Sequence, residues 1–134
     1  MSPTQRSLAY LRAQGYIVAV VEQTVPKTFI KRDLFGFADL LAIKPGKLNL
    51  AEFASRWELP MPDDDELAED PPIGRIILIQ VTSSSNVAAR RTKIAAEPRA
   101  SLWKQAGGEI HLHGWSKKGP RGKRKVWSVN VEEM

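Results

Sequence analysis

The segment Ile76–Thr82 constrains the fold more than any other, because it is almost wholly apolar and rich in β-branched residues. This composition is typical of a buried strand. A buried strand needs other strands beside it and helices over its faces. The segment therefore predicts a sheet with helices packed against it.

The remaining segments supply the other elements of such a sheet. Further strands are predicted at Tyr16–Val21, Phe37–Ile43, Glu109–Trp115 and Lys125–Val131. Helices are predicted from Ser2 to Gly15, from Ser83–Asn86 through Ile94, from Pro98 to Gly107, and briefly at Asn49–Trp57. The polar, proline-containing segment Gln23–Leu34 favours a loop. The order of helix, three strands, helix and two strands indicates the α/β class.

A length of 134 residues suits one domain that spans residues 1–134. The chain has no cysteine, which excludes disulfides and thiolate zinc sites and fits a reducing cytoplasm. No apolar run approaches the roughly 20 residues that cross a bilayer, and residues 1–5 lack the pattern of a signal peptide. We therefore expect a cytoplasmic protein without a membrane partner.

The charge is distributed unevenly along the chain. Residues 51–74 hold eight of the 15 acidic residues and one of the 20 basic residues, and form a proline-bearing acidic insertion. The rest of the chain therefore carries a net charge of +12. A body this basic favours a polyanionic partner. The simpler alternatives are a soluble basic surface and, for the insertion, a solvated loop or a contact site for another protein.

Asp39 and Gln80 are polar residues inside two otherwise apolar strands. A buried carboxylate is unfavourable unless it is paired, hydrogen-bonded or bound to a metal. Strand alternation places Gln80 on one face with Leu78 and Thr82. Asp39 at a frayed strand end, bonded to backbone, is the simpler interpretation. Two such interruptions in neighbouring strands nevertheless favour a shared polar site.

Two basic segments have the composition of phosphate-binding surfaces. The first is a helix start that combines hydroxyl and amide side chains with three bases: Ser84, Asn86, Arg90, Arg91 and Lys93. The second, the basic segment (residues 117–125), is glycine-rich and includes Lys117, Lys118, Arg121, Lys123 and Arg124. The alternatives are a plain capped helix with a basic outer face and a solvated turn.

His111 and His113 fall on one strand face, where two imidazoles could bind a metal ion. Because no third ligand is evident nearby, a structural or DNA-facing role is expected instead. Trp103, Trp115 and Trp127 have apolar neighbours, so core packing is expected, with Trp115 as a candidate stacking surface for a base.

Residues Gly36–Ile43 around Asp39, followed by Ile77–Ser83 and then a basic helix, resemble the PD-(D/E)xK nuclease superfamily. The similarity is greatest to its small Holliday-junction-resolvase-like branch, which is often found in phages. It implies a restriction-endonuclease-like core, in which α-β-β-β-α-β elements form a mixed central sheet flanked by helices. It also implies a Mg²⁺- or Mn²⁺-dependent endonuclease that cuts branched or structured DNA. We then expect a homodimer in a bacterial or phage-infected cell.

The resemblance assigns roles to individual residues. Asp39 matches the metal-binding Asp of the second strand, and the Val81 backbone carbonyl would be a further ligand. Gln80 stands where the family has an acid, and Thr82 where it has a lysine. Gln5 also stands where resolvase-like members often have a Glu. The catalytic motif is therefore degenerate at three positions.

Other residues could replace the missing charges. Glu22 and Asp33 could add carboxylates, although Glu22 is more simply a surface charge at a strand end. Lys93 could act as a migrated lysine, with Arg90 and Arg91 as alternatives. If these compensations fail, the chain would be a catalytically inactive nuclease-fold module that binds DNA.

Overall fold

The structure of the chain is a computed structural model that describes residues 1–46, 55–58, 60 and 74–134. The described helices are α1 (Pro3–Ala13), α4 (Val87–Ala96) and α5 (Pro98–Gln105), and a 3-10 turn, η1 (Ser84–Asn86), leads into α4. The strands are β1 (Ile17–Val20), β2 (Gln23–Thr24), β3 (Lys31–Arg32), β4 (Leu40–Lys44), β5 (Arg75–Ser83), β6 (Glu109–Lys118) and β7 (Val126–Glu133). Most of the predicted Asn49–Trp57 helix and of the acidic insertion lies outside the described residues.

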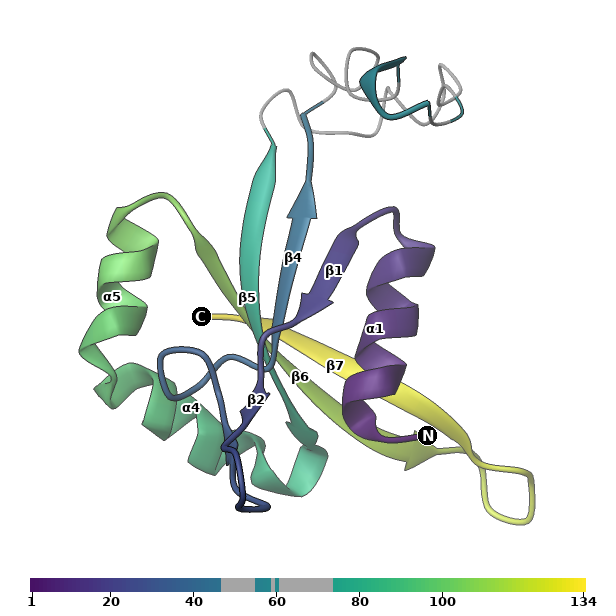
Figure 1. Cartoon of the computed structure of the whole chain (residues 1–134). Helices are drawn as coiled ribbons and strands as arrows, with labels where there is room; N and C mark the ends of the chain where they lie inside the picture. Colours follow the sequence, from purple (N-terminus) through teal and green to yellow (C-terminus); the bar gives the residue numbers. More distant parts are fainter. Residues whose placement is uncertain (47–54, 59, 61–73) are drawn as a thin grey trace.

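Five of these strands form one mixed sheet in the order β1-β4-β5-β6-β7. All neighbours are antiparallel except β5 and β6, which are parallel. The central position of β5 explains its composition, because it has a strand on each side and helices over both faces (Figure 1). The predicted α/β class, with a mixed sheet flanked by helices, is confirmed.

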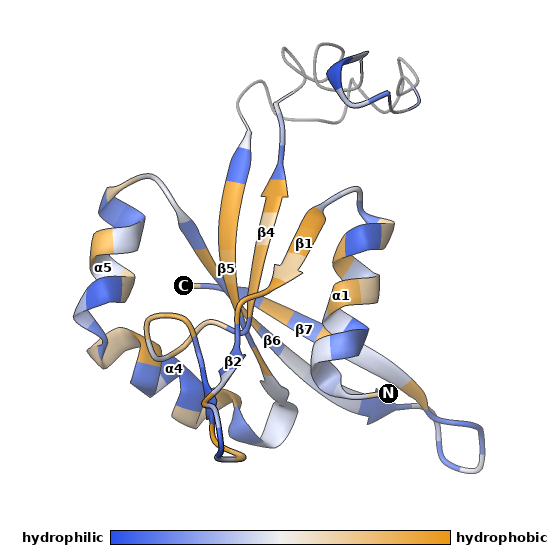
Figure 2. Cartoon of the chain, in the orientation of Figure 1, coloured by the Kyte–Doolittle hydropathy of each residue, from blue (hydrophilic) through white to orange (hydrophobic). Residues whose placement is uncertain are grey.

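Helix α1 covers one face of the sheet, and α4 and α5 cover the other (Figure 1). Hydrophobic residues run along β1, β4 and β5, which these helices enclose (Figure 2). The core under α1 includes Leu8, Leu11, Ile77, Ile79 and Val81. The core under α4 and α5 includes Leu78, Ile94, Ala100, Ile110 and Leu112. The predicted alternation of β5 is therefore confirmed.

The prediction of a loop over Gln23–Leu34 is wrong, because β2 and β3 pair as an antiparallel hairpin. Its tip contains a turn in which the Val25 carbonyl accepts the Thr28 N–H at 3.2 Å. Pro26 suits the first central position of such a turn, and Lys27 follows with a φ of +62°. Each strand has only two residues, both exposed, so the hairpin lacks the apolar alternation that identifies longer strands.

Ser7 on α1 connects two buried aromatic rings of β6. Its hydroxyl accepts the Trp115 indole N–H at 2.8 Å and is hydrogen-bonded to the His113 Nδ1 at 2.9 Å. Burial lowers the pKa of His113 to about 4, so the imidazole is neutral at pH 7. This polar contact fixes α1 over the sheet.

No described helix has the length and apolar character required to cross a membrane.

Replacement of Ser7 by alanine should destabilise the fold by about 1–3 kcal/mol, because it leaves the buried Trp115 N–H and His113 Nδ1 without their shared partner. Urea denaturation at pH 7 measures the change. Ser101→Ala is the matched control, since Ser101 also lies on a helix but is exposed. Equal midpoints for the two variants would contradict this role for Ser7.

Candidate active site

Asp39 immediately precedes β4, which begins at Leu40 and not at Phe37 as predicted, because residues 35–37 form a turn. Its backbone N–H donates to the Ile79 carbonyl at 2.9 Å, and its carbonyl accepts the Val21 N–H at 3.0 Å. The residue is only 5% exposed. Asp39 is therefore at a strand end and bonded to backbone, as the simpler interpretation has it, but this end is buried and hydrogen-bonded on both sides.

The Asp39 carboxylate is bound from β5. Its Oδ2 accepts the Val81 backbone N–H at 2.8 Å and the Gln80 side-chain amide at 2.7 Å. The two polar interruptions predicted to share a site are thus direct partners. The other atom of the Gln80 amide, the buried Oε1, has no hydrogen-bond partner among the described residues. An oxygen in this state is suited to accept a proton donor or to bind a cation.

Two further carboxylates join Asp39. Oxygens of Glu22, Asp33 and Asp39 all lie within 4.8 Å of one another, and we call these residues the carboxylate cluster. Glu22 immediately precedes β2, and Asp33 immediately follows β3. The β2–β3 hairpin therefore brings both residues to Asp39, because its two ends meet at its base. The structure thus does not support the simpler interpretation of Glu22 as an isolated surface charge.

The surroundings of Asp39 in the carboxylate cluster favour its protonated, uncharged form. The pKa of Asp39 is raised from 3.8 to about 8, mainly by burial and also by Asp33 and Glu22, while the Val81 hydrogen bond opposes the rise. The nearby cations are Lys31, 3.3 Å from Glu22, and Lys93, 3.8 Å from Asp33. Clustered carboxylates with a free amide oxygen are the hard donors that Mg²⁺ and Mn²⁺ prefer.

Helix α4 directs its basic residues to different places. The Lys93 ammonium lies 3.8 Å from Asp33 and so beside the carboxylate cluster. Arg91 instead binds Glu132 of β7 through two hydrogen bonds of 2.7 and 2.8 Å. Arg91 is therefore not the substitute cation of this site. Thr82 is buried in β5 and carries no charge that could take that role.

A hollow of about 420 Å³ opens beside the carboxylate cluster. Its lining is mostly cationic and consists of Lys31, Arg32, Asp33, Phe35, Gly36, Lys93 and Arg99. Arg99 is bonded to Glu97, and Lys31 and Lys93 pair with Glu22 and Asp33. The lining still holds more bases than acids, which favours an anionic ligand. A phosphate held here would lie next to the carboxylate cluster.

The residues predicted to bind phosphates are on the surface. Ser84 and Asn86 are exposed in η1, and residues 117–125 are exposed at the β6–β7 connection, which projects from the body (Figure 1).

The predicted stacking role of Trp115 is wrong, because Trp115 is buried and bonded to Ser7. Trp127 was expected in the core, but edge strand β7 leaves it 43% exposed.

The two histidines have different surroundings. His113 is bonded to Ser7, whereas the His111 Nε2 lies 3.6 Å from Glu109 and 3.7 Å from Glu133. Glu133 is a neighbour of His111 that no local sequence pattern indicates, because the two residues meet only through the pairing of β6 with β7. Arg75 binds both oxygens of Glu109 at 2.7 Å and already offsets that charge. Both histidines are buried, so neither faces DNA.

Comparison with known proteins gives no match. No family model, curated protein or solved structure matches this chain. Its function is therefore inferred from the chemistry of its own residues.

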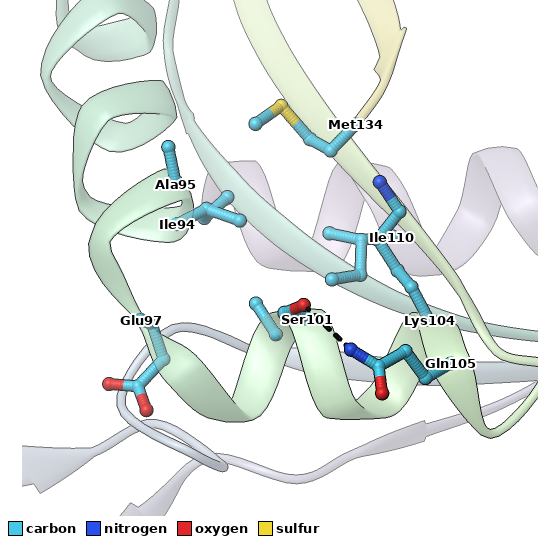
Figure 3. Close-up of a pocket in the computed structure, with 9 residues that line it drawn as sticks. Ile94, Ala95, Glu97, Ser101, Lys104, Gln105, Ile110 and Met134 are labelled. Carbon is cyan, nitrogen blue, oxygen red and sulfur yellow. Dashed lines mark hydrogen bonds between the residues drawn. The ribbon is translucent and has the colours of Figure 1, made fainter.

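A second pocket, of about 530 Å³, lies where α4 and α5 meet β6 (Figure 3). Its lining combines the apolar Ile94 and Ile110 with the side chains of Lys104 and Gln105. The acidic residue of this pocket, Glu97, already accepts a hydrogen bond from Arg99 at 2.7 Å. This pocket thus lacks the grouped carboxylates that define the carboxylate cluster.

Removal of the Asp39 charge should stabilise the fold at high pH. The folded pKa of about 8 exceeds the unfolded value of 3.8, so the folded state alone holds this proton between those pH values. Stability therefore falls as pH rises through this range, by several kcal/mol at about 1.4 kcal/mol per pKa unit. Urea denaturation between pH 5 and pH 9 should show this slope in the wild type and not in Asp39→Asn.

Glu132→Gln, which removes an exposed carboxylate paired with Arg91, is the control and should retain the wild-type slope. Mg²⁺ should stabilise the wild type at pH 8 and leave Asp39→Asn unchanged. Identical slopes for the wild type and Asp39→Asn would contradict a buried, uncompensated charge at Asp39.

Proposed function

We propose that the chain is a Mg²⁺-dependent DNA endonuclease with a restriction-endonuclease-like core, similar to the Holliday-junction resolvases. It would hydrolyse phosphodiester bonds in branched or structured DNA. The observation that carries this proposal is the carboxylate cluster with Lys93 beside it and a cationic hollow next to both. Mn²⁺ would substitute for Mg²⁺.

Asp39, Asp33 and Glu22 would hold the metal ion, with the Val81 carbonyl and the Gln80 Oε1 as further oxygen ligands. The donors fit a hard divalent cation, because three carboxylates are grouped at one point and the amide of Gln80, whose oxygen has no partner among the described residues, is bonded to one of them. A bound cation supplies activation of water and charge neutralisation at the phosphate. The amide of Gln80 and the N–H of Val81 orient Asp39 for this role.

Lys93 would take the place of the family's lysine, since position 82 is a threonine. Its ammonium lies 3.8 Å from Asp33, so a phosphate at the carboxylate cluster would be within reach of it. A cation at this point stabilises the negative charge that develops as the phosphodiester is attacked. Lys31, Arg32 and Arg99 line the same hollow and would hold the neighbouring phosphates.

A homodimer suits this activity, because a two-fold axis places two identical sites on the two strands of a symmetric junction. The basic segment (residues 117–125) would then extend the contact with DNA away from the site, through phosphates and without sequence preference.

The first test is cleavage of a four-way junction and of a linear duplex, with Mg²⁺, with Mn²⁺ and with chelator. Asp39→Asn should abolish cleavage and retain DNA binding, because it removes a metal ligand and leaves the surface intact. Lys93→Ala should slow cleavage by roughly 10²- to 10³-fold. Lys104→Ala, an exposed lysine of α5 outside the cationic hollow, is the control and should keep the wild-type rate.

The second test addresses DNA affinity. The double variant Lys123→Ala/Arg124→Ala should reduce the slope of log K against log salt by about two, because each phosphate contact releases about one counterion. Cleavage at low salt should persist, since neither residue belongs to the carboxylate cluster. An unchanged slope would place the basic segment outside the DNA contact.

An inactive DNA-binding module is the alternative, and one observation favours it. Gln80 already donates to Asp39, and so partly supplies the compensation that a metal ion would otherwise give. Tight, salt-sensitive DNA binding without cleavage in either metal would support this alternative over the nuclease.

A further inference from the structure

The tip of the β2–β3 hairpin exposes an aromatic side chain. Phe29 is 103% exposed, so that the rest of the chain shields none of its ring, and the next residue, Ile30, is 62% exposed. Single apolar residues on a surface are common and need no partner. Phe29 is of interest because of how it is held, what surrounds it and where the hairpin begins and ends.

The hairpin holds Phe29 through four hydrogen bonds. The Val25 N–H donates to the Ile30 carbonyl at 2.8 Å, and the Thr28 N–H and hydroxyl donate to the Val25 carbonyl at 3.2 and 3.0 Å. The Ile30 N–H donates to the Thr28 hydroxyl at 3.4 Å. The backbone on both sides of Phe29 is therefore bonded, and little ordering of it would be needed on binding.

The charges around Phe29 fit nucleic acid. The hairpin, residues 23–32, contains Lys27, Lys31 and Arg32 and no acidic residue. An exposed aromatic ring among cations matches a partner that combines phosphates with flat, stackable bases. Proteins use apolar side chains of this kind as wedges that enter a base step and unstack it.

The hairpin also connects Phe29 to the carboxylate cluster. Glu22 and Asp33 stand at its two ends, and Lys31 of β3 contacts Glu22 at 3.3 Å. Phe29 precedes Asp33 by four residues, which span about 13 Å when extended. A DNA strand rises 3.4 Å per nucleotide, so this reach corresponds to roughly four nucleotides.

We propose that Phe29 is a wedge that enters DNA at a branch point and sets the distance from that branch point to the cut. The inference rests on the proposed function, because it takes the carboxylate cluster as the cleavage site. A base step at a branch point joins two arms and not two parts of one continuous duplex, so a phenyl ring can enter and unstack it at a lower cost than within a duplex. The wedge would thereby favour branched DNA over linear DNA.

The test uses Phe29→Ala, Phe29→Trp and the control Leu102→Ala, which removes another exposed apolar side chain, 60% exposed, from α5. A four-way junction carries 2-aminopurine at the branch point, and binding is measured in Ca²⁺ or chelator. Wild-type protein should raise the 2-aminopurine fluorescence by unstacking it. Phe29→Ala should lose this rise and bind the junction about tenfold more weakly, with duplex affinity unchanged.

Phe29→Trp and Leu102→Ala should both behave as the wild type, because the first keeps an aromatic wedge and the second lies elsewhere. With Mg²⁺, wild-type cuts should fall roughly four nucleotides from the branch point, and those of Phe29→Ala should spread over several positions. Equal urea midpoints for all variants exclude a folding defect.

The outcomes separate the wedge from the function on which it rests. A wild-type protein that binds and cuts junctions, with Phe29→Ala identical to it in fluorescence, affinity and cut position, would overturn the wedge alone. Equal weakening on junction and duplex would also overturn it, in favour of a general contact. Loss of the fluorescence rise in Phe29→Ala without cleavage by any variant would support the wedge on a non-catalytic module. Absence of DNA binding by the wild type would overturn both.

Discussion

The hydrogen bonds to the Asp39 carboxylate are the interaction on which the rest of the site depends. Val81 and Gln80 of β5 bind one of its oxygens at 2.8 and 2.7 Å, inside a sheet that excludes water. A charge in this position requires compensation, which two hydrogen bonds supply only in part. Glu22 and Asp33 lie beside this buried group, and Lys93 approaches it from α4.

The β2–β3 hairpin between β1 and β4 joins this site to the surface. Its ends carry Glu22 and Asp33, and its tip carries Phe29. The opposite face of the sheet has a different character, because Ser7 closes it over His113 and Trp115 with neutral hydrogen bonds. The chemistry and the cationic hollow therefore gather on the face that α4 and α5 cover, while the α1 face serves stability.

Some features followed from local sequence alone, and others did not. The alternation of β5 and the pairing of Gln80 with Asp39 were predictable, because a strand has a fixed period of two residues. The hairpin was missed, because two-residue polar strands leave no such period. The exposure of Trp127 was missed for another reason, since it depends on the place of β7 at the edge of the sheet. The neighbours of Trp127 in the sequence contain no information about that place.

The sequence by itself determined the order of the core elements and the presence of a polar pair on one face of the central strand. Backbone periodicity and β-branched composition are sufficient for both. Only the tertiary structure decided that Glu22 and Asp33 join Asp39, and that Lys93 rather than Arg91 faces them. The physical reason is that Arg91 and Lys93 are two positions apart on α4, so their side chains leave the helix about 200° apart around its axis. Which of them reaches the site depends on how α4 docks on the sheet, a long-range contact that no local pattern encodes.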